Sequence, residues 1–263
     1  MHPFAWCHVG ASVVGTSHQE NGGLCEDSAV TIERCGSEGP VLIAVVSDGA
    51  GSAARGRAGS RFVVRGIARS AAGFVKGGAP LRSLGEETIR IWLDDLRDAI
   101  AVRAESEGLE LRDYAATLVA ALISGDFAVV AHIGDGACIL GSSEGYLVPS
   151  WPAHGEYASS TYFATDNQVN LVVTSREGKF DRAAVFSDGL ELLLLQHDTK
   201  TAFAPFFDVA FGRLRRLPVG RDRTESLQLA TYLASEKVAR RTDDDKTLLL
   251  GYRVKQDPCP SSP

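Results

Sequence analysis

Short acidic segments recur along this chain, and two of them stand directly after runs of apolar residues. The segments are Glu26-Asp27, Ser47-Asp48-Gly49, Ser187-Asp188-Gly189 and Asp243-Asp244-Asp245. The runs at 41–46 and 183–186 have the pattern of buried strands, so each delivers a carboxylate to the rim of a sheet. Carboxylates gathered at one rim repel one another unless a hard cation neutralises them, and oxygen ligands suit Mg²⁺ or Mn²⁺ better than Zn²⁺. The sequence therefore predicts a metal site built from residues distant in the chain.

The size and composition of the chain are those of a soluble globular protein. Its 263 residues are 44% hydrophobic and 23% charged, which is sufficient to bury a substantial core. No internal repeat or low-complexity block interrupts the chain. We expect one domain over residues 1–255 and a disordered tail over residues 256–263.

Charge and cysteine content narrow the partners and the compartment. The net charge of −6 argues against a nucleic acid or an anionic membrane as a partner. No apolar run is long enough to span a membrane, and the first residues lack the pattern of a signal peptide. Five scattered cysteines without a CxxC pair favour reduced thiols over disulfides. We expect a cytoplasmic monomer that binds neither nucleic acid nor membrane.

Basic residues cluster in one part of the chain. They are Arg213, Arg215, Arg216, Arg221 and Arg223. A solvated helix end and a phosphate-binding surface explain this cluster equally well from the sequence.

The hydrophobic pattern predicts strands interleaved with helices. Strand-like runs lie at 9–15, 28–34, 41–46, 116–124, 127–133, 137–140, 145–148, 183–186 and 248–252. Helices are expected around 63–74, 89–100, 190–195 and 203–213, followed by one longer helix through 227–238. A hairpin at Gly125-Asp126 is expected to continue as a meander to residue 148, and residues 149–181 are expected to form an irregular flap. This order predicts an α+β fold with two packed sheets flanked by helices.

Five motifs carry a resemblance to a known family. They are Cys25-Glu26-Asp27, Ser47-Asp48-Gly49-Ala50-Gly51-Ser52, Ile133-Gly134-Asp135-Gly136, Phe186-Ser187-Asp188-Gly189-Leu190 and Asp244-Asp245-Lys246-Thr247. Each is weak alone, but their order resembles that of the metal-dependent serine/threonine protein phosphatases of type 2C, over residues 9–253. The resemblance implies a four-layer α-β-β-α sandwich of two mainly antiparallel sheets. The metal ions would then lie at one edge, between the sheets.

The resemblance also implies a ligand set for two Mn²⁺ or Mg²⁺ ions. Asp48 would bridge both ions, and the backbone carbonyl of Gly49 would bind one of them. Asp188 and Asp244 would complete the protein ligands of the first ion. Glu26 would serve the second ion, directly or through water.

Two further carboxylates are implied to assist. Asp27 would lie beside Glu26 in the first or second shell of the second ion. Asp135 would help Asp188 hold a third, weaker ion. Taken singly, each of these aspartates is explained as well by a solvated turn or a helix N-cap.

The implied activity is hydrolysis of phosphoserine and phosphothreonine in proteins by a metal-activated water. A phosphomonoester is dianionic and hydrolyses very slowly in water, so the catalyst must neutralise charge and supply a nucleophile. No nucleophilic cysteine or serine is then required. The implied partner is a phosphorylated protein, which a partner serine/threonine kinase would supply.

The sequence departs from the family pattern at three places. Many members bind the substrate phosphate with an arginine near the first motif, where this chain offers His18, as a phosphate ligand, a proton donor or a locally bonded loop residue. Eukaryotic members have a histidine at the position of Ala50. The usual Gly-Asp-Ser-Arg segment reads Gly-Asp-Gly-Ala at 134–137, and together with Ser52 and the residues at 154–157 it resembles a bacterial branch.

Other functions remain open from the sequence. A catalytically inactive phosphatase-like module would explain the missing arginine and histidine. A phosphatase of small phosphorylated metabolites would use the same metal site. A thiol nucleophile formed by Cys25 and His18 has no flanking signature to support it.

Overall fold

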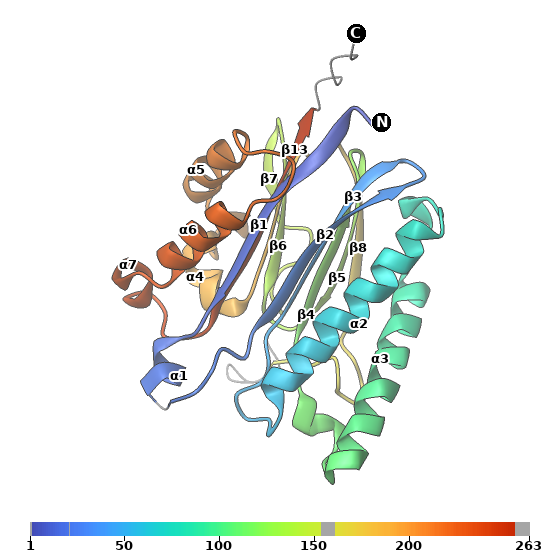
Figure 1. Cartoon of the computed structure of the whole chain (residues 1–263), viewed down its shortest axis with the longest axis vertical. Coiled ribbons are helices and arrows are strands. Elements are labelled where there is room, and N and C mark those ends of the chain that lie inside the picture. The colour runs from blue at the N-terminus through green and yellow to red at the C-terminus, as the bar shows by residue number, and fades with distance from the viewer. Residues whose placement is uncertain (1, 21, 154–160, 256–263) are drawn as a thin grey trace.

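Two sheets pack face to face, and helices cover both outer faces (Figure 1). The computed structural model describes residues 2–20, 22–153 and 161–255. Within these residues one sheet has six strands in the order β12-β1-β13-β9-β6-β7, and the other has five in the order β2-β3-β4-β5-β8. All neighbouring strands are antiparallel except β1 and β12. The predicted tail at 256–263 and the motif at 154–157 lie outside the described residues.

The strands have the following bounds. The six-stranded sheet contains β1 (Phe4–Val13), β6 (Ala137–Ser142), β7 (Gly145–Leu147), β9 (Arg182–Phe186), β12 (Gly220–Arg221) and β13 (Lys246–Lys255). The five-stranded sheet contains β2 (Ser28–Gly36), β3 (Gly39–Ser47), β4 (Leu118–Ile123), β5 (Phe127–Ile133) and β8 (Val172–Glu177). A separate ribbon consists of β10 (Leu195–Gln196) and β11 (Thr201–Ala202).

The helices form two outer layers of different character (Figure 1). Two long helices cover the five-stranded sheet, α2 (Gly56–Lys76) and α3 (Glu86–Glu107). The six-stranded sheet is covered by α4 (Glu191–Leu194), α5 (Ala204–Leu214), α6 (Arg223–Leu233) and α7 (Glu236–Ala239). The remaining short helices are α1 (Thr16–Glu20) and the 3-10 turns η1 (Leu81–Ser83), η2 (Leu111–Tyr114) and η3 (Asp188–Leu190). No helix in the described part of the chain is long and apolar enough to cross a membrane.

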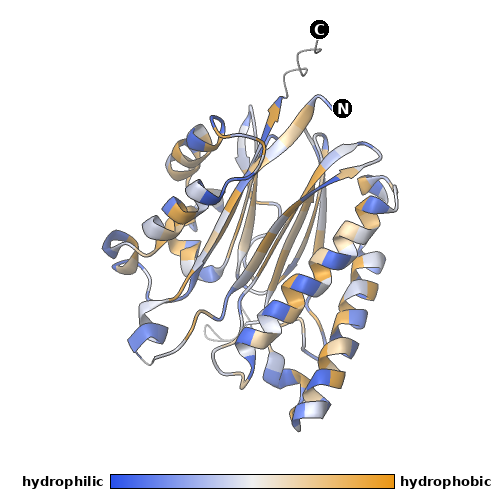
Figure 2. Ribbon diagram, in the orientation of Figure 1, coloured by the Kyte–Doolittle hydropathy of each residue, from blue (hydrophilic) through white to orange (hydrophobic). Residues whose placement is uncertain are grey.

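Strand β3 shows why a continuous apolar run becomes a central strand. All nine of its residues are buried. Because side chains alternate across a strand, Ile43 and Val45 pack under α2 and α3, whereas Leu42 and Val46 pack between the sheets. Figure 2 shows the same arrangement for the whole molecule, with apolar strands inside and helices whose polar faces point outward. These layers confirm the predicted four-layer sandwich.

The predicted meander through residue 148 is wrong. After β5 the chain leaves the five-stranded sheet, and β6 pairs with β9 and β7 in the other sheet. The change of sheet occurs at Gly134, whose φ of 101° lies in the left-handed region that glycine adopts without strain. A side chain at Gly134 would also collide with Thr117. This crossover brings Asp135 to the edge of the sandwich.

Two other predictions of secondary structure are corrected. The predicted flap at 149–181 contains β8, which closes the five-stranded sheet beside β5. The predicted long helix breaks at Ser235, whose backbone is extended, into α6 and α7. On one continuous helix Leu233 and Val238 would point about 140° apart, since each residue turns the helix by about 100°. The break allows both side chains to be buried in the same core.

Candidate metal centre

The acidic motifs meet at one edge of the sandwich because their strands come from both sheets. Asp48 follows β3 in one sheet, whereas Asp188 follows β9 in the other, and Asp244 precedes its neighbour β13. Asp27 immediately precedes β2, and Asp135 lies in the crossover between β5 and β6. The charges of Asp27, Asp188 and Asp244 act on Asp48, and those of Asp135, Asp244 and Asp27 act on Asp188. The structure therefore brings these predicted residues together.

A cavity of about 300 Å³ opens at this edge. Its acidic lining is Asp48, Asp135 and Asp188. The remaining lining residues are Ala50, Gly51, Ser52, Thr161 and Phe163. Its described lining contains three carboxylates and no basic side chain, so it attracts cations from solvent.

Burial and mutual repulsion disfavour the charged forms of these carboxylates. Burial, followed by the charges of Asp27 and Asp188, raises the pKa of Asp48 well above its usual range. Burial, Asp135 and Asp244 do the same to the pKa of Asp188. Burial also raises the pKa of Asp27 to about 6, against the effect of its hydrogen bonds. A bound divalent cation would lower these pKa values again, because it stabilises the deprotonated form of each ligand.

Several carboxylate oxygens at this edge are buried without a donor. The Oδ2 of Asp27 accepts a 2.7 Å hydrogen bond from Ser187, but its Oδ1 has no hydrogen-bond partner among the described residues. Asp135 repeats the pattern, since its Oδ2 accepts from Thr161, whereas its Oδ1 and Oε2 of Glu26 also lack a partner in the part of the chain that the structure describes. No group of three His, Cys, Asp or Glu side chains in the described ranges has ready-made metal-ligand geometry. The chemistry of the donors nevertheless fits a hard cation, since buried acceptors without donors are costly unless a cation occupies them.

Two glycines allow the backbone to close tightly around the aspartates. A Cβ atom at Gly49 would lie 2.3 Å from the carbonyl oxygen of Gly56, and one at Gly189 would lie 2.0 Å from that of Asp245. Both contacts are impossible for any other residue without movement of the backbone. The Asp-Gly pairs in the sequence are therefore explained by packing as well as by chemistry.

Comparison with known proteins decides the family. A model of the family described as protein phosphatase 2C matches residues 14–233. The chain belongs to the protein phosphatase 2C family. It is a serine/threonine protein phosphatase, a hydrolase of a metal-dependent family, as the sequence predicted.

Individual relatives agree with this assignment. The phosphatase is 31% identical to serine/threonine-protein phosphatase 3 of Escherichia coli (strain K12) over 249 residues, 94% of this chain and 98% of the relative. It is similar to the catalytic domain of the serine/threonine protein phosphatase PstP in complex with two manganese ions, with a TM-score of 0.63, 19% identity and coverage of 96% and 100%. It is also similar to PppA of Pseudomonas aeruginosa, with a TM-score of 0.64, 17% identity and coverage of 95% and 100%. At these identities the two structures support the fold alone.

Asp245 lies at the acidic edge of this phosphatase, although the sequence analysis assigned it no role. Its side chain is 1% exposed, with Oδ1 accepting the N–H of Gly15 and Oδ2 accepting the N–H of Glu26, both at 2.6 Å. The neighbouring Asp244 accepts the N–H of Asp245 at 2.7 Å. Asp245 therefore ties the loop that carries Glu26 to the segment that carries Asp244. An acidic pair entering a strand was the available signal, because alternation sends one member inward.

His18 lies at the same edge, on α1. Its Nδ1 is 3.1 Å from Oδ1 of Asp245, and a Cβ atom at Gly51 would lie 3.8 Å from its Nε2. Burial acts to lower the pKa of His18, but the hydrogen bond and charge of Asp245, with Glu26, raise it on balance. The predicted His18 thus lies beside the acidic edge, on the short helix that precedes the first motif.

Arg57 is a second residue that the sequence analysis missed. It stands in the first turn of α2, where its backbone nitrogen would be 2.9 Å from a Cβ atom at Gly49. Burial raises the pKa of Glu26, and the positive charges of His18 and Arg57 counteract the rise. The phosphatase therefore has a half-buried arginine near its acidic edge, supplied by a different segment from the one searched in the sequence.

Two predicted alternatives find no support at this edge. Burial raises the pKa of the Cys25 thiol far above its usual range, and Asp27 adds to the rise, so this cysteine is a poor nucleophile. The basic cluster at 213–223 does not line the acidic cavity, and its Arg213 pairs with Glu225 at 2.8 Å.

Proposed function

We propose that this phosphatase hydrolyses phosphoserine and phosphothreonine with two Mn²⁺ or Mg²⁺ ions held at the acidic edge. The observation that supports it is the set of buried, mutually repelling carboxylates around one cavity, with oxygens that lack donors. When bound, the ions supply charge neutralisation and lower the pKa of the attacking water.

Each predicted ligand keeps the role expected of it in this proposal. Asp48 would be shared by both ions, and the carbonyl of Gly49 would bind one of them. Asp188 and Asp244 would hold the first ion, and Glu26 would serve the second, directly or through water. Each of these residues lies on a tightly packed segment, so the ligands are positioned before a cation arrives.

Two carboxylates take supporting roles. We assign Asp27 to the first or second coordination shell of the second ion. Ser187 donates a hydrogen bond to one of its carboxylate oxygens, and the other oxygen accepts none among the described residues. Asp135 has the same half-satisfied arrangement with Thr161, and we assign it with Asp188 to a third, weaker ion.

The substrate phosphate requires positive charge from the protein as well. We assign this role to Arg57 and His18, the two basic side chains whose charges act on Glu26. We also assign His18 the role of donating a proton to the leaving group, because Ala50 offers no proton donor. A guanidinium binds phosphate oxygens in a bidentate manner, so Arg57 carries most of the expected affinity.

The proposal also covers the domain bounds, the oligomeric state, the compartment and the source of the substrates. We propose that residues 1–255 act as one catalytic domain, that the protein works as a cytoplasmic monomer and that a serine/threonine kinase generates its substrates. Size-exclusion chromatography with light scattering tests the monomer, and fractionation of cells tests the compartment.

Chelation is the test of the proposed function. Excess EDTA is expected to abolish turnover of phosphoserine and phosphothreonine peptides, and Mn²⁺ or Mg²⁺ is expected to restore it. Phosphosugars and nucleotides serve as the comparison, and we expect them to be hydrolysed more slowly than the peptides. Full activity in EDTA with no carried-over metal, or a preference for the metabolites, contradicts the proposal.

A further inference from the structure

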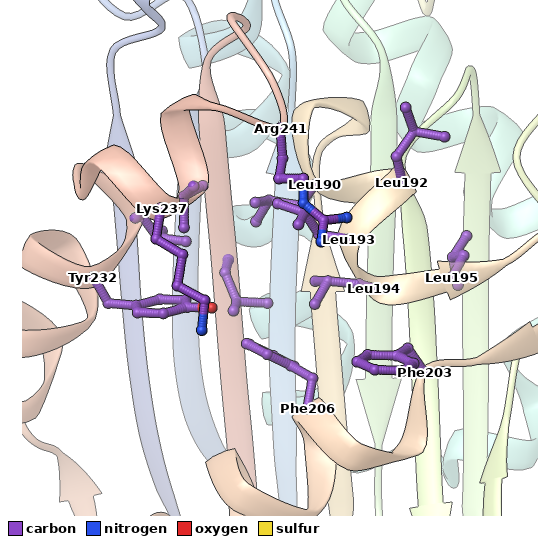
Figure 3. A pocket seen from close by; sticks show the side chains of 13 residues that line it. Leu190, Leu192, Leu193, Leu194, Leu195, Phe203, Phe206, Tyr232, Lys237 and Arg241 are labelled. Carbon is purple, nitrogen blue, oxygen red and sulfur yellow. The ribbon is translucent and has the colours of Figure 1, made fainter.

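An apolar groove runs along the outer layer of helices on the six-stranded sheet and shares no described lining residue with the acidic cavity. It consists of two hollows of about 380 and 410 Å³. The hollows share the lining residues Phe203, Phe206, Tyr232 and Lys237, so they are continuous. Figure 3 shows the first hollow, with Phe203 and Phe206 on one side and Lys237 and Arg241 reaching over it from the other.

The apolar side chains of this groove are unusually exposed for their size. Leu192 on α4 is 74% exposed, and Val209 on α5 is 68% exposed. Phe203 and Tyr232 are also exposed. Burying such side chains against a partner would stabilise the complex, because apolar surface is removed from water. Clustered apolar exposure of this kind marks an interaction surface.

The positive charge of the groove indicates what kind of segment it would bind. Lys237 and Arg241 form no ion pair with any other described residue. Glu225 is the groove's acidic lining residue in the described ranges, and Arg213 neutralises it at 2.8 Å. The groove is therefore positive on a protein whose net charge is −6. A complementary occupant presents apolar side chains flanked by carboxylates.

We infer that this groove docks an acidic, apolar segment of the phosphoprotein substrate, at a distance in its sequence from the phosphorylated residue. The inference rests on the proposed function, since it concerns the same substrates. A second copy of this chain would bring like charges together if it used the same face. A membrane is disfavoured because the apolar side chains line a concave groove, whereas membrane insertion requires them to project.

The groove is connected in sequence to the metal ligands. Leu190 lines it and lies two residues after Asp188, in the same 3-10 turn. Arg241 lines it and lies three residues before Asp244. The groove thus lies on the two chain segments that continue to the acidic edge, and a substrate segment held there would direct its phosphorylated residue toward that edge.

The test uses a fluorescein-labelled peptide of about 15 residues, with Leu and Phe at helical spacing and Asp or Glu elsewhere. Fluorescence anisotropy is expected to show binding to the wild-type protein, and Lys237→Glu is expected to weaken it by about tenfold or more. Leu192→Ser should weaken it as well. Arg216→Glu is the matched control, because Arg216 is exposed and basic but lines neither hollow, and it should bind like the wild type.

A kinetic readout links docking to catalysis. Joining the acidic segment to a phosphothreonine peptide should lower KM for the wild type and for Arg216→Glu, but not for Lys237→Glu. Turnover of p-nitrophenyl phosphate with Mn²⁺ is measured on every variant, so that loss of the proposed function is recognised separately from loss of docking.

Several results overturn the inference. These are equal binding of a peptide with lysine at every acidic position, equal binding by Lys237→Glu, or no effect of the segment on KM while p-nitrophenyl phosphate is still hydrolysed. Cosedimentation of the wild type with phosphatidylserine vesicles, lost in Lys237→Glu, would assign the groove to membranes instead.

Discussion

Strand β3 runs from the interior of the sandwich to its acidic edge. The interior is packed with apolar side chains, whereas the edge gathers buried carboxylates. In the interior every residue of β3 is buried against apolar partners from both sides. One residue beyond the strand, Asp48 faces Asp27 and Asp188, and burial disfavours its charged form. Apolar burial in the interior stabilises the folded state, whereas repulsion between the buried carboxylates at the edge destabilises it. Fold and catalysis are therefore expected to respond to different substitutions.

The largest expected effect comes from removing the shared ligand. Asp48→Ala should lower turnover of a phosphopeptide by about a thousandfold or more, which corresponds to ~4 kcal/mol of transition-state stabilisation. Circular dichroism should show that the variant stays folded. A variant that retains more than about a tenth of the wild-type rate would mean that the site is misassigned.

A variant in the core should have the opposite effect, with stability lowered and activity retained. Ile43→Ala removes a fully buried side chain from β3 and should lower the free energy of unfolding by about 2–5 kcal/mol. Turnover per folded molecule should stay near that of the wild type. If this variant lost activity while folded, the separation between interior and edge would be wrong.

The next effect concerns a residue that positions ligands. Asp245→Asn removes one of the two carboxylate acceptors that hold Gly15 and Glu26. The affinity for Mn²⁺, measured by isothermal titration calorimetry, should fall by about 10- to 100-fold. Asp243→Asn is the matched control, because Asp243 is exposed and uses its backbone carbonyl to bind Ser17. Equal affinities for the two variants would remove Asp245 from the site.

A smaller effect is expected at the crossover between the sheets. Asp135→Asn keeps an oxygen for Thr161 but loses its charge. Turnover should fall by about tenfold, as expected when a positioned charge is lost, while the first two Mn²⁺ ions remain bound. An unchanged rate would leave Asp135 as a turn residue, and loss of tight Mn²⁺ binding would place it in the primary site.

The smallest effect is on the stability of the metal-free protein. The raised pKa values of Asp27 and Asp48 mean that the folded state binds more protons than the unfolded state. The stabilisation is complete below about pH 4 and is lost as the pH rises through about 6, the pKa of Asp27. In EDTA at pH 7, Asp48→Asn should therefore raise Tm by about 2–4 °C per kcal/mol of repulsion removed.

Calorimetry in Mn²⁺ provides the opposite readout for that variant. The wild type should then be the more stable of the two, because it binds the ions more tightly. If Asp48→Asn melts below the wild type in EDTA as well, repulsion at the edge does not limit stability.

Much of the fold could be predicted because local pattern and burial agree. Continuous apolar runs became β3 and β9, and the helical spacing of Val63, Ile67 and Ala71 became the buried face of α2. The sheet that β6 joins could not be predicted, since an apolar strand pairs equally well with either neighbour until the crossover at Gly134 is formed. The strand β8 has mostly exposed residues, so it lacked the pattern of a buried strand.

The residues at the acidic edge also fall into two groups, those that local sequence predicts and those that only tertiary contacts define. Asp48 and Asp188 could be placed at a sheet edge from the sequence because an apolar strand is followed closely by aspartate and glycine. Asp245 and Arg57 were missed because their positions depend on segments that meet only in three dimensions, at Gly15 and at the start of α2. Which member of an acidic pair points inward is decided by packing, and sequence spacing alone does not report it.

The position of β13 has a consequence for the synthesis of the enzyme. This strand pairs with β1 along its whole length and with β9 on its other side, so the segment that lies between these two strands is made after both of them. Until residues 246–255 have emerged from the ribosome, β1 and β9 have no neighbour between them and Asp244 has no strand to position it. A nascent chain that lacks β13 is therefore expected to be inactive as a catalyst, and activity should begin only when β13 is inserted between β1 and β9.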